Sequence, residues 1–213
     1  MTMEFDITCA ILAGGESRRM GQNKAFIQVA GGGSLAKGIW LFDYVYGTCK
    51  ELFSEIIIVT NQPQQFEDYQ AQVVIDAIRG AGSLGGLYTA LMQASNYHTF
   101  CVACDMPFLK PELISHLIKK RLNYDIVIPR TKEGSEPLHA IYSKRCIQPI
   151  KKLLDKGELK ITKLLSSEVR VCYCEEEELK KIDPFLASFT NVNTRKDLLE
   201  IRRILKGGQW EVA

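Results

Sequence analysis

The sequence has 213 residues, of which 46% are hydrophobic, 24% charged and 9% aromatic. This composition is ordinary for a globular protein and excludes a chain that is disordered throughout. Lys and Arg number 27 against 25 Asp and Glu, which gives a net charge of +2 and no overall attraction for nucleic acid. The length suits one large α/β domain, which we place over residues 1–213.

Targeting signals and cysteine usage give the expected compartment. No apolar run approaches the roughly 18 residues that cross a bilayer. Residues 1–6 carry two acidic side chains where a secretory signal has basic ones. The seven cysteines are scattered, and Cys101 and Cys104, although spaced like a redox or zinc pair, have no second pair nearby. We therefore predict a cytoplasmic protein with no membrane association, whose cysteines are buried thiols.

Seven short runs rich in apolar residues predict strands, and several are nearly all apolar, as strands buried on both faces of a parallel sheet are. They are residues 7–13, 55–60, 72–78, 99–104, 124–129, 138–143 and 169–174. Apolar side chains at helical spacing predict helices within 35–53, 84–94 and 113–122. A last helix is expected from Thr194, with Asp197 as a variant of the capping box, to Gly207. The acidic run 175–178 is interpreted as a solvated turn.

This alternation of strands and helices is typical of a doubly wound, mostly parallel α/β sheet. In such sheets ligands bind outside the carboxyl ends of the strands. The loops that follow the strands are therefore where chemistry is expected.

The loop after the first strand combines glycines with cations. Gly14 and Gly15 let the backbone approach a ligand and turn N–H groups toward an anion. Arg18, Arg19 and Lys24 follow within the same loop. The loop lacks the Gly-Lys-Ser/Thr ending of a Walker A sequence, but it predicts a cradle for a polyphosphate.

A second glycine loop, residues 80–85, reads Gly-x-Gly-x-x-Gly between a predicted strand and a helix, and Asp105 lies twenty residues beyond Gly85. That pattern is the dinucleotide fingerprint, so an NAD-dependent dehydrogenase is one alternative. Against it, the fingerprint belongs on the first strand, which here carries a different loop. Asp105 also lies in the tight turn 104–108, where a carboxylate suits a metal better than a ribose.

Further polar side chains fall at the same predicted edge. Asp76 and Asp105 lie at or near strand ends: Asp105 suits Mg²⁺, and Asp76 suits a ribose hydroxyl or a base edge. Asn191 and Asn193 precede the last helix and offer side-chain amides. His139 begins a strand and is a candidate to face the site. The sequence shows no Ser/His/Asp or Cys/His set and no histidine metal cluster.

Taken in chain order, these segments resemble the molybdenum cofactor guanylyltransferase family. The first is Leu-Ala-Gly-Gly-x-Ser-x-Arg-Met-Gly-x-x-Lys from residue 12, which many nucleotidyltransferases share. It is followed by Asp76 with Gly-x-Gly-x-Leu-Gly-Gly from residue 80, Cys-Asp-Met-Pro-Phe from 104, Pro-Leu-His-Ala from 137 and Asn-x-Asn-Thr-x-x-Asp-Leu from 191. The ordered set is more specific than the first motif alone and covers nearly the whole chain.

The resemblance implies a Rossmann-like nucleotidyltransferase fold and Mg²⁺-dependent transfer of GMP from GTP to molybdenum-bound molybdopterin. The products are the guanine dinucleotide form of the cofactor and pyrophosphate. It implies that the N-terminal half binds GTP and the C-terminal half binds molybdopterin. Molybdenum-inserting proteins or molybdoenzymes are the implied partners for delivery and handover, and nucleic acid is not a partner.

The resemblance also assigns roles to residues. The implied nucleotide contacts are Leu12, Ala13, Gly14, Gly15, Lys24, Asn61, Asp76, Gly82 and Asp105. Arg19, Lys24 and Asp105 are expected to act in catalysis, Asp105 and Asn193 to bind the metal, and His139 and Asn191 to contact the second substrate. A set of basic residues in the C-terminal half is interpreted as a solvated helix face rather than a phosphate site: Lys144, Arg145, Lys151, Lys152, Lys160 and Lys163.

Three positions depart from the usual pattern of this family. Asn23 replaces Asp, Ser83 replaces Pro, and Glu136 replaces Gln. Other readings therefore stay open: a cytidylyltransferase for the same cofactor, a sugar or isoprenoid nucleotidyltransferase, and a nucleotide-binding adaptor without catalysis. The Asn-x-Asn-Thr ending argues against the sugar and isoprenoid enzymes, and the intact Lys24 and Asp105 argue against the adaptor.

Overall fold

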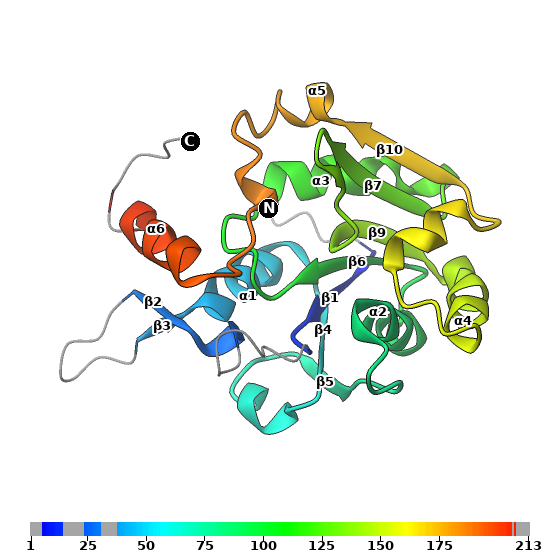
Figure 1. Cartoon of the computed structure of the whole chain (residues 1–213), viewed down its shortest axis with the longest axis horizontal. Coiled ribbons are helices and arrows are strands. Elements are labelled where there is room, and N and C mark those ends of the chain that lie inside the picture. The colour runs from blue at the N-terminus through cyan, green and yellow to red at the C-terminus, as the bar shows by residue number, and fades with distance from the viewer. Residues whose placement is uncertain (1–5, 15–23, 31–37, 206, 208–213) are drawn as a thin grey trace.

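A computed structural model describes residues 6–14, 24–30, 38–205 and 207 (Figure 1). Within these residues the central sheet has eight strands in the order β10-β7-β9-β6-β1-β4-β5, with β8 paired to β7. All seven predicted strands are present. The strands are β1 Thr8–Leu12, β4 Glu55–Thr60, β5 Gln72–Ile75, β6 His98–Ala103, β7 Ile126–Thr131, β8 Gly134–Ser135, β9 His139–Ser143 and β10 Val171–Glu175.

The sheet is doubly wound and mostly parallel, as predicted. β1 lies parallel to β4 on one side and to β6 on the other, β4 is parallel to β5, and β10 is parallel to β7. Only β9, between β6 and β7, and the short β8 run antiparallel to their described neighbours. From β1 the chain first builds outward to β4 and β5 and then returns to β6, so the strand order reverses beside β1. Ligands bind at this kind of switch point.

Helices cover both faces of the sheet, and the period-2 alternation of β1 shows how. Cys9 and Ile11 enter the core shared with α1 Leu41–Leu52 and α3 Pro111–Lys120. Ala10 and Leu12 enter the core shared with α2 Gly82–Gln93 and α4 Ile147–Asp155, which lie side by side in Figure 1. All five β1 residues are buried, which explains why four of them are apolar.

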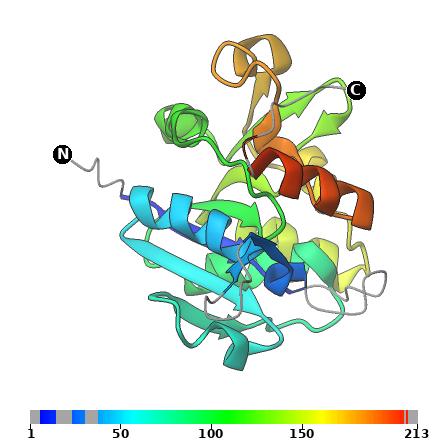
Figure 2. The same ribbon diagram turned by 90° about the vertical axis from the view of Figure 1, so that its left-hand side faces the viewer.

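A third, smaller apolar cluster joins an early segment of the chain to the last helix. The hairpin of β2 Gln28–Ala30 and β3 Ile39–Trp40 packs with Val29 against Leu198 and Ile201 of α6 Arg195–Leu205 (Figure 2). The cap of α6 has the predicted form: Thr194 Oγ1 accepts from the Asp197 N–H (3.2 Å), and the Asp197 carboxylate accepts from the Thr194 N–H (2.8 Å).

Two local expectations are corrected. The helix expected within 35–53 begins only at Leu41, because Ile39 and Trp40 pair with β2 and the Trp40 N–H donates to Asp43 (2.7 Å). The acidic run 175–178 is not a solvated turn. It enters the short helix α5 Glu176–Leu179, where Glu176 is 7% exposed and accepts hydrogen bonds from the Lys132 N–H and the Lys180 ammonium. No described helix combines the length and apolar character that a membrane span needs.

One buried carboxylate joins three segments at the far end of the sheet. The Asp125 side chain is 2% exposed and accepts from the Arg170 backbone N–H (2.9 Å) and from its guanidinium (3.2 Å). Burial alone would raise the pKa of Asp125, but the bonds from Arg170 and the charge of Arg145 lower it below its usual value. The charged form therefore contributes stability above the ordinary carboxyl pKa, and this contribution is lost as the pH falls through the lowered one.

We predict that Asp125→Ala lowers the free energy of unfolding by about 1–2 kcal/mol at neutral pH, because charged hydrogen bonds are lost but the Arg170 guanidinium stays solvated. Urea unfolding between neutral and strongly acidic pH measures this, and the difference from wild type should shrink as the pH falls. Asp155→Ala is the matched control, because Asp155 is exposed and pairs with Lys151 one helical turn away. A loss that is equally large at acidic pH would contradict this account.

Candidate functional site

A cavity of about 190 Å³ lies at the carboxyl ends of β1, β4 and β6, beside the loop that leads into α2. Most of the predicted nucleotide contacts line it: Leu12, Ala13, Gly14, Lys24, Asp76, Gly82 and Asp105. The predicted residues Gly15 and Arg19, together with Arg18 and Asn23, lie outside the described residues. The structure therefore brings together residues that are up to 93 positions apart in the sequence, from Leu12 to Asp105.

The end of β1 is held from both sides. The Ala13 N–H donates to the Val59 carbonyl (2.8 Å), and the Leu12 carbonyl accepts from the Cys104 N–H (3.2 Å). Asn61 does not line the cavity, but its side-chain amide lies next to the loop, since a side chain on Gly14 would come within 3.7 Å of Asn61 Nδ2. The start of the first loop, at Ala13 and Gly14, is thus fixed at the strand ends with Gly14 exposed.

Asp76 is almost buried, with 8% exposure, and one of its oxygens is held within the protein. Asp76 Oδ1 accepts from the Ile78 N–H (3.1 Å) and lies 3.0 Å from the Thr89 hydroxyl on α2. The carboxylate also lines the cavity. This arrangement leaves Asp76 oriented toward a ligand. Thr89, which sets that orientation, lies within the apolar run of α2 and carries no sequence signal of a functional role.

Close packing explains why one position of the second glycine loop, residue 85, is a glycine. A Cβ atom on Gly85 would lie 2.7 Å from Ala81 Cβ and 3.0 Å from the Ile78 carbonyl oxygen. Gly82, with φ of 59°, begins α2 in a left-handed conformation. The loop therefore forms a tight junction between strand and helix whose first turn, Gly82 and Ser83, lines the cavity.

The most polar contact of the cavity joins three distant segments. Lys24 Nζ lies 2.7 Å from Asn193 Oδ1 and 3.2 Å from Asp105 Oδ2. Lys24 comes from the 3-10 turn Lys24–Phe26, Asp105 follows β6, and Asn193 precedes α6. A second link fixes the same pair of segments, since the Val192 N–H donates to the Asp105 carbonyl (3.0 Å). The Lys24 ammonium group is therefore held between two side-chain oxygen atoms at the carboxyl ends of the strands.

These donors fit a divalent cation. A carboxylate and an amide oxygen are ligands that Mg²⁺ accepts, and it fills its other positions with phosphate and water. The two oxygens are already arranged around a positive charge, that of the Lys24 ammonium. Burial, followed by the charge of Asp105, raises the pKa of the adjacent Cys104 thiol to about 12, and sulfur is not a ligand that Mg²⁺ prefers.

A second cavity of about 580 Å³ has Asn193 in its lining, and the contact of Asn193 with Lys24 connects it to the first cavity. Asn191, predicted to contact the second substrate, lines this cavity together with Glu136 and the exposed Phe185. Burial and the charge of Glu133 raise the pKa of Glu136. The second cavity therefore combines an aromatic face, an amide and a carboxyl group.

His139 lies in neither cavity. It is completely buried in β9, and its ring packs edge-on against Phe100 (5.2 Å between centroids) and Phe189 (5.1 Å). Burial lowers the pKa of His139 to about 3, so the ring is neutral. Since Phe189 stands between His139 and the second cavity, any effect of His139 on a second substrate passes through Phe189.

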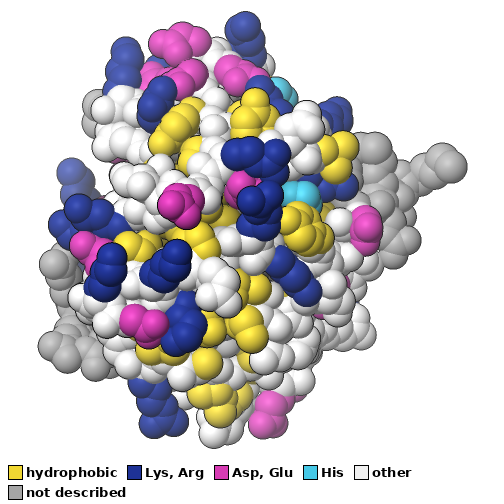
Figure 3. Space-filling model, turned by 90° about the vertical axis from the view of Figure 1, so that its right-hand side faces the viewer, with side chains coloured by type: hydrophobic (Ala, Val, Ile, Leu, Met, Phe, Trp, Pro, Cys, Tyr) yellow, Lys and Arg dark blue, Asp and Glu magenta, His cyan; other side chains and the backbone are white. Residues whose placement is uncertain are grey.

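The basic residues of the C-terminal half line neither of these cavities. They lie on and around α4, on the side of the molecule shown in Figure 3, where Lys and Arg are mixed with acidic and apolar side chains. Lys151, for example, pairs with Asp155 one turn further along α4. Their placement agrees with a solvated face.

Comparison with known proteins decides the family. Residues 9–171 match the MobA-like NTP transferase domain. The chain belongs to this family. The molybdenum cofactor guanylyltransferase of Desulfosudis oleivorans is 38% identical over 205 residues, covering 95% of this chain and 98% of that protein.

Solved structures agree with the MobA-like assignment. Molybdopterin-guanine dinucleotide biosynthesis protein A from Archaeoglobus fulgidus superposes with a TM-score of 0.79 at 29% identity, covering 94% of this chain and 99% of that one. The 2-C-methyl-D-erythritol 4-phosphate cytidylyltransferase of Thermus thermophilus, at 15% identity, covers 95% of this chain and 100% of its own with a TM-score of 0.67, which shows the fold alone. The nucleotidyltransferase fold is thereby confirmed, and the fingerprint at 80–85 does not make this protein a dehydrogenase.

The packing of the second glycine loop gives a stability prediction for this MobA-like transferase. We expect Gly85→Ala to lower the free energy of unfolding by about 1–3 kcal/mol, because the new methyl group overpacks against Ala81 and Ile78. The control is Gly47→Ala in α1, where a Cβ atom meets nothing within 4 Å; it should stabilise by about 0.5–1 kcal/mol. Urea unfolding of both variants measures the difference, and equal effects would refute the packing role of Gly85.

Proposed function

We propose that this protein transfers GMP from GTP to molybdenum-bound molybdopterin and releases pyrophosphate. The observation that carries the proposal is the contact of Lys24 with Asp105 and Asn193 at the switch point of a MobA-like fold. The relative from Desulfosudis oleivorans, matched over nearly its whole length, is named for this activity. The proposal includes molybdenum-inserting proteins or molybdoenzymes as delivery and handover partners and a place in the cytoplasm.

The reaction requires little acid–base catalysis by the protein. The attacking group is a terminal phosphate of molybdopterin, which is already ionised at neutral pH. No general base is therefore required, and the neutral Cys104 thiol and the buried His139 are not asked to act as one. What the chain must supply is alignment of the two phosphates and compensation of the charge that develops on the departing pyrophosphate.

Different residues of the first cavity have different roles in this reaction. The backbone at Ala13 and Gly14 faces the phosphates, and Asp76, held through Oδ1, presents its remaining acceptor capacity to the ribose or the base of GTP. Bound at Asp105 and Asn193, Mg²⁺ would supply further positive charge at the phosphates. Lys24, which holds the same two oxygens, is then released to pair with a phosphate oxygen.

The second cavity is suited to molybdopterin. Phe185 is 58% exposed there and offers a flat apolar face to a planar ring, while Asn191 and Glu136 offer hydrogen-bonding groups to its edge. Lys132 on the same rim supplies positive charge for a phosphate, whereas Lys180 there is paired with Glu176. Lys24 lines the first cavity and Asn193 the second, so the two substrates meet beside the contact between these residues.

We expect Lys24→Ala and Asp105→Asn each to lower turnover by about 100-fold or more, because charge compensation in a dry site acts mainly on the transition state. Pyrophosphate release with GTP, Mg²⁺ and molybdopterin measures the rate, and thermal melting checks the fold. Lys50→Ala is the control, since Lys50 is exposed and pairs with Gln70. If either variant kept a near-wild-type rate at saturating GTP and Mg²⁺, the proposed catalytic role of that residue would be wrong.

Calorimetric titration with GTP, CTP and NADH separates the other readings. Mg²⁺-dependent GTP binding followed by pyrophosphate release supports the guanylyltransferase. Tighter binding of CTP would favour the cytidylyltransferase. GTP binding without turnover would favour a silent adaptor, and a response to NADH alone would overturn the proposal.

Glu136 gives a prediction for the second substrate. Its carboxylate form repels a phosphate-bearing pterin, so Glu136→Gln is expected to lower the KM for molybdopterin by about threefold to tenfold while the KM for GTP stays unchanged. Steady-state kinetics with each substrate varied in turn measures the two constants. Glu158→Gln, at a partly exposed residue that lines neither cavity, is the control. An equal change in both KM values would place Glu136 outside the pterin side.

A further inference from the structure

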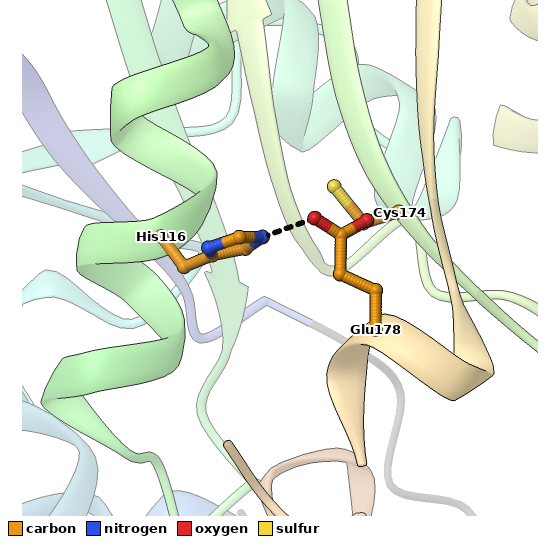
Figure 4. Close-up of side chains that lie close together, drawn as sticks. All are labelled: His116, Cys174 and Glu178. Carbon is orange, nitrogen blue, oxygen red and sulfur yellow. Dashed lines mark hydrogen bonds and ion pairs between the residues drawn. The ribbon is translucent and has the colours of Figure 1, made fainter. Parts of the chain in front are cut away.

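Three metal-ligating side chains from three elements converge at the β10 edge of the sheet (Figure 4). They are His116 from α3, Cys174 from β10 and Glu178 from α5, and one ligand atom of each lies within 4.8 Å of the other two. His116 Nε2 and Glu178 Oε1 are 2.7 Å apart, and the Cys174 thiol lies next to the Glu178 carboxylate in the close-up. None of the three takes part in the proposed transfer reaction.

The combination of atoms is more selective than a cluster of carboxylates. Imidazole nitrogen, thiolate sulfur and carboxylate oxygen together match the ligands of Zn²⁺, whereas Mg²⁺ and Ca²⁺ prefer oxygen alone. Bonds of about 2.0–2.3 Å from these atoms to one zinc ion require the ligand atoms to lie roughly 3.3–3.8 Å apart in a tetrahedral site. The observed spacing needs only small side-chain shifts to reach this arrangement.

We propose that His116, Cys174 and Glu178 bind one Zn²⁺ ion, with water as the fourth ligand. Cys174 is buried at 0% exposure, whereas the side chains of His116 and Glu178 are 27% and 33% exposed, so the site has an inner sulfur and an open outer side through which an ion enters. On binding, the Cys174 S–H bond breaks, a Zn–S bond forms and the proton passes to solvent. His116 coordinates through the Nε2 lone pair, with its ring proton on Nδ1.

A lysine competes for the same position. Lys120 Nζ lies 2.6 Å from Glu178 Oε1, on the helix that also carries His116. Its side chain is 31% exposed, so the ammonium group can turn to solvent when a metal arrives. The site therefore exists in two forms, one in which Lys120 holds Glu178 and one in which Zn²⁺ replaces it. Removing this cation should strengthen the metal site, which no ordinary surface cluster predicts.

The position of the site gives the ion a structural role. α5 carries Glu178 and leads directly into the segment that supplies Phe185, Asn191 and Asn193 to the second cavity. An ion bound to α3, β10 and α5 would hold the start of this segment to the sheet. Its effect is expected on thermal stability rather than on the transfer chemistry.

The test uses the full-length protein, stripped of metal with a chelator and titrated with Co²⁺ and with Zn²⁺ alone. Co²⁺ bound to a thiolate produces a near-ultraviolet charge-transfer band, which oxygen sites such as Asp105 with Asn193 do not give. We expect one equivalent of Co²⁺ to produce the band, Zn²⁺ to displace it, and Zn²⁺ to raise the melting temperature. Cys174→Ser should abolish the band, and His116→Ala, which changes an exposed-side ligand, should weaken affinity by about tenfold or more.

Two matched variants complete the experiment. Cys104→Ser, which removes a thiol beside the first cavity, should leave the band intact, and Lys120→Met should tighten Zn²⁺ binding several-fold. The proposal is overturned if the band is absent, survives Cys174→Ser, is lost in Cys104→Ser, or is indifferent to His116→Ala. Since these readouts do not involve GTP, they are independent of the proposed transferase activity.

Discussion

The carboxyl end of β1 is the point on which the site depends. Leu12 lies opposite Val59 of β4 and Ala103 of β6, so three parallel strands end at the same level. The hydrogen bonds of the Ala13 N–H and the Leu12 carbonyl then direct the chain outward between the neighbouring loops. Because both faces of β1 are packed in cores, a one-residue shift in register would place the loops at different heights and move each side chain into the core on the opposite face. The core that stabilises the fold thus also sets the position of Ala13 and Gly14, where the loop expected to bind phosphate begins.

Charge at the site is balanced inside the protein before any substrate arrives. The Lys24 ammonium group, with the side chain only 21% exposed, is compensated by Asp105 and Asn193. An unpaired cation at this depth would be costly, and an unpaired carboxylate equally so. Under the proposed function, a triphosphate together with a divalent cation would replace this pairing without leaving either group alone, since the phosphate would take the lysine and the metal the two oxygens. Ligand binding at such a site exchanges partners rather than creating new buried charge.

Patterns of local order were readable from the sequence, and contacts between distant segments were not. The seven strands were predicted because burial on both faces makes them short runs rich in apolar residues, and the cap at Thr194 and Asp197 because its geometry is local. The start of α1 was misplaced, since the pairing of Ile39 and Trp40 with β2 overrides their place in a helical pattern. Burial of Glu176 was missed for the same reason: its partners, Lys132 and Lys180, include one 44 residues away.

The predicted site residues show the same difference between local patterns and contacts of distant segments. Glycine spacing and strand ends indicated Gly14, Gly82, Asp76 and Asp105 directly, because these follow from the strand order. The position of Asn193 depended on the family resemblance, since nothing local shows that the entry to α6 reaches Lys24 across 169 residues. For His139 the resemblance gave the residue but not its surroundings: the packing of Phe100 and Phe189 that buries it is a tertiary property.

The contact between the β2–β3 hairpin and α6 maintains the geometry of the site. Arg202 of α6 donates two hydrogen bonds to the Gln28 carbonyl of the β2–β3 hairpin, and Ile201 packs into the same cluster as Val29. The hairpin follows Lys24 in the chain, and α6 follows Asn193. Fixing α6 on the hairpin therefore fixes the distance between Lys24 and Asn193, and through the Val192 N–H bond the distance to Asp105 as well. A small apolar cluster outside the sheet thus maintains the geometry of the charged contact, although none of its side chains lines the cavity.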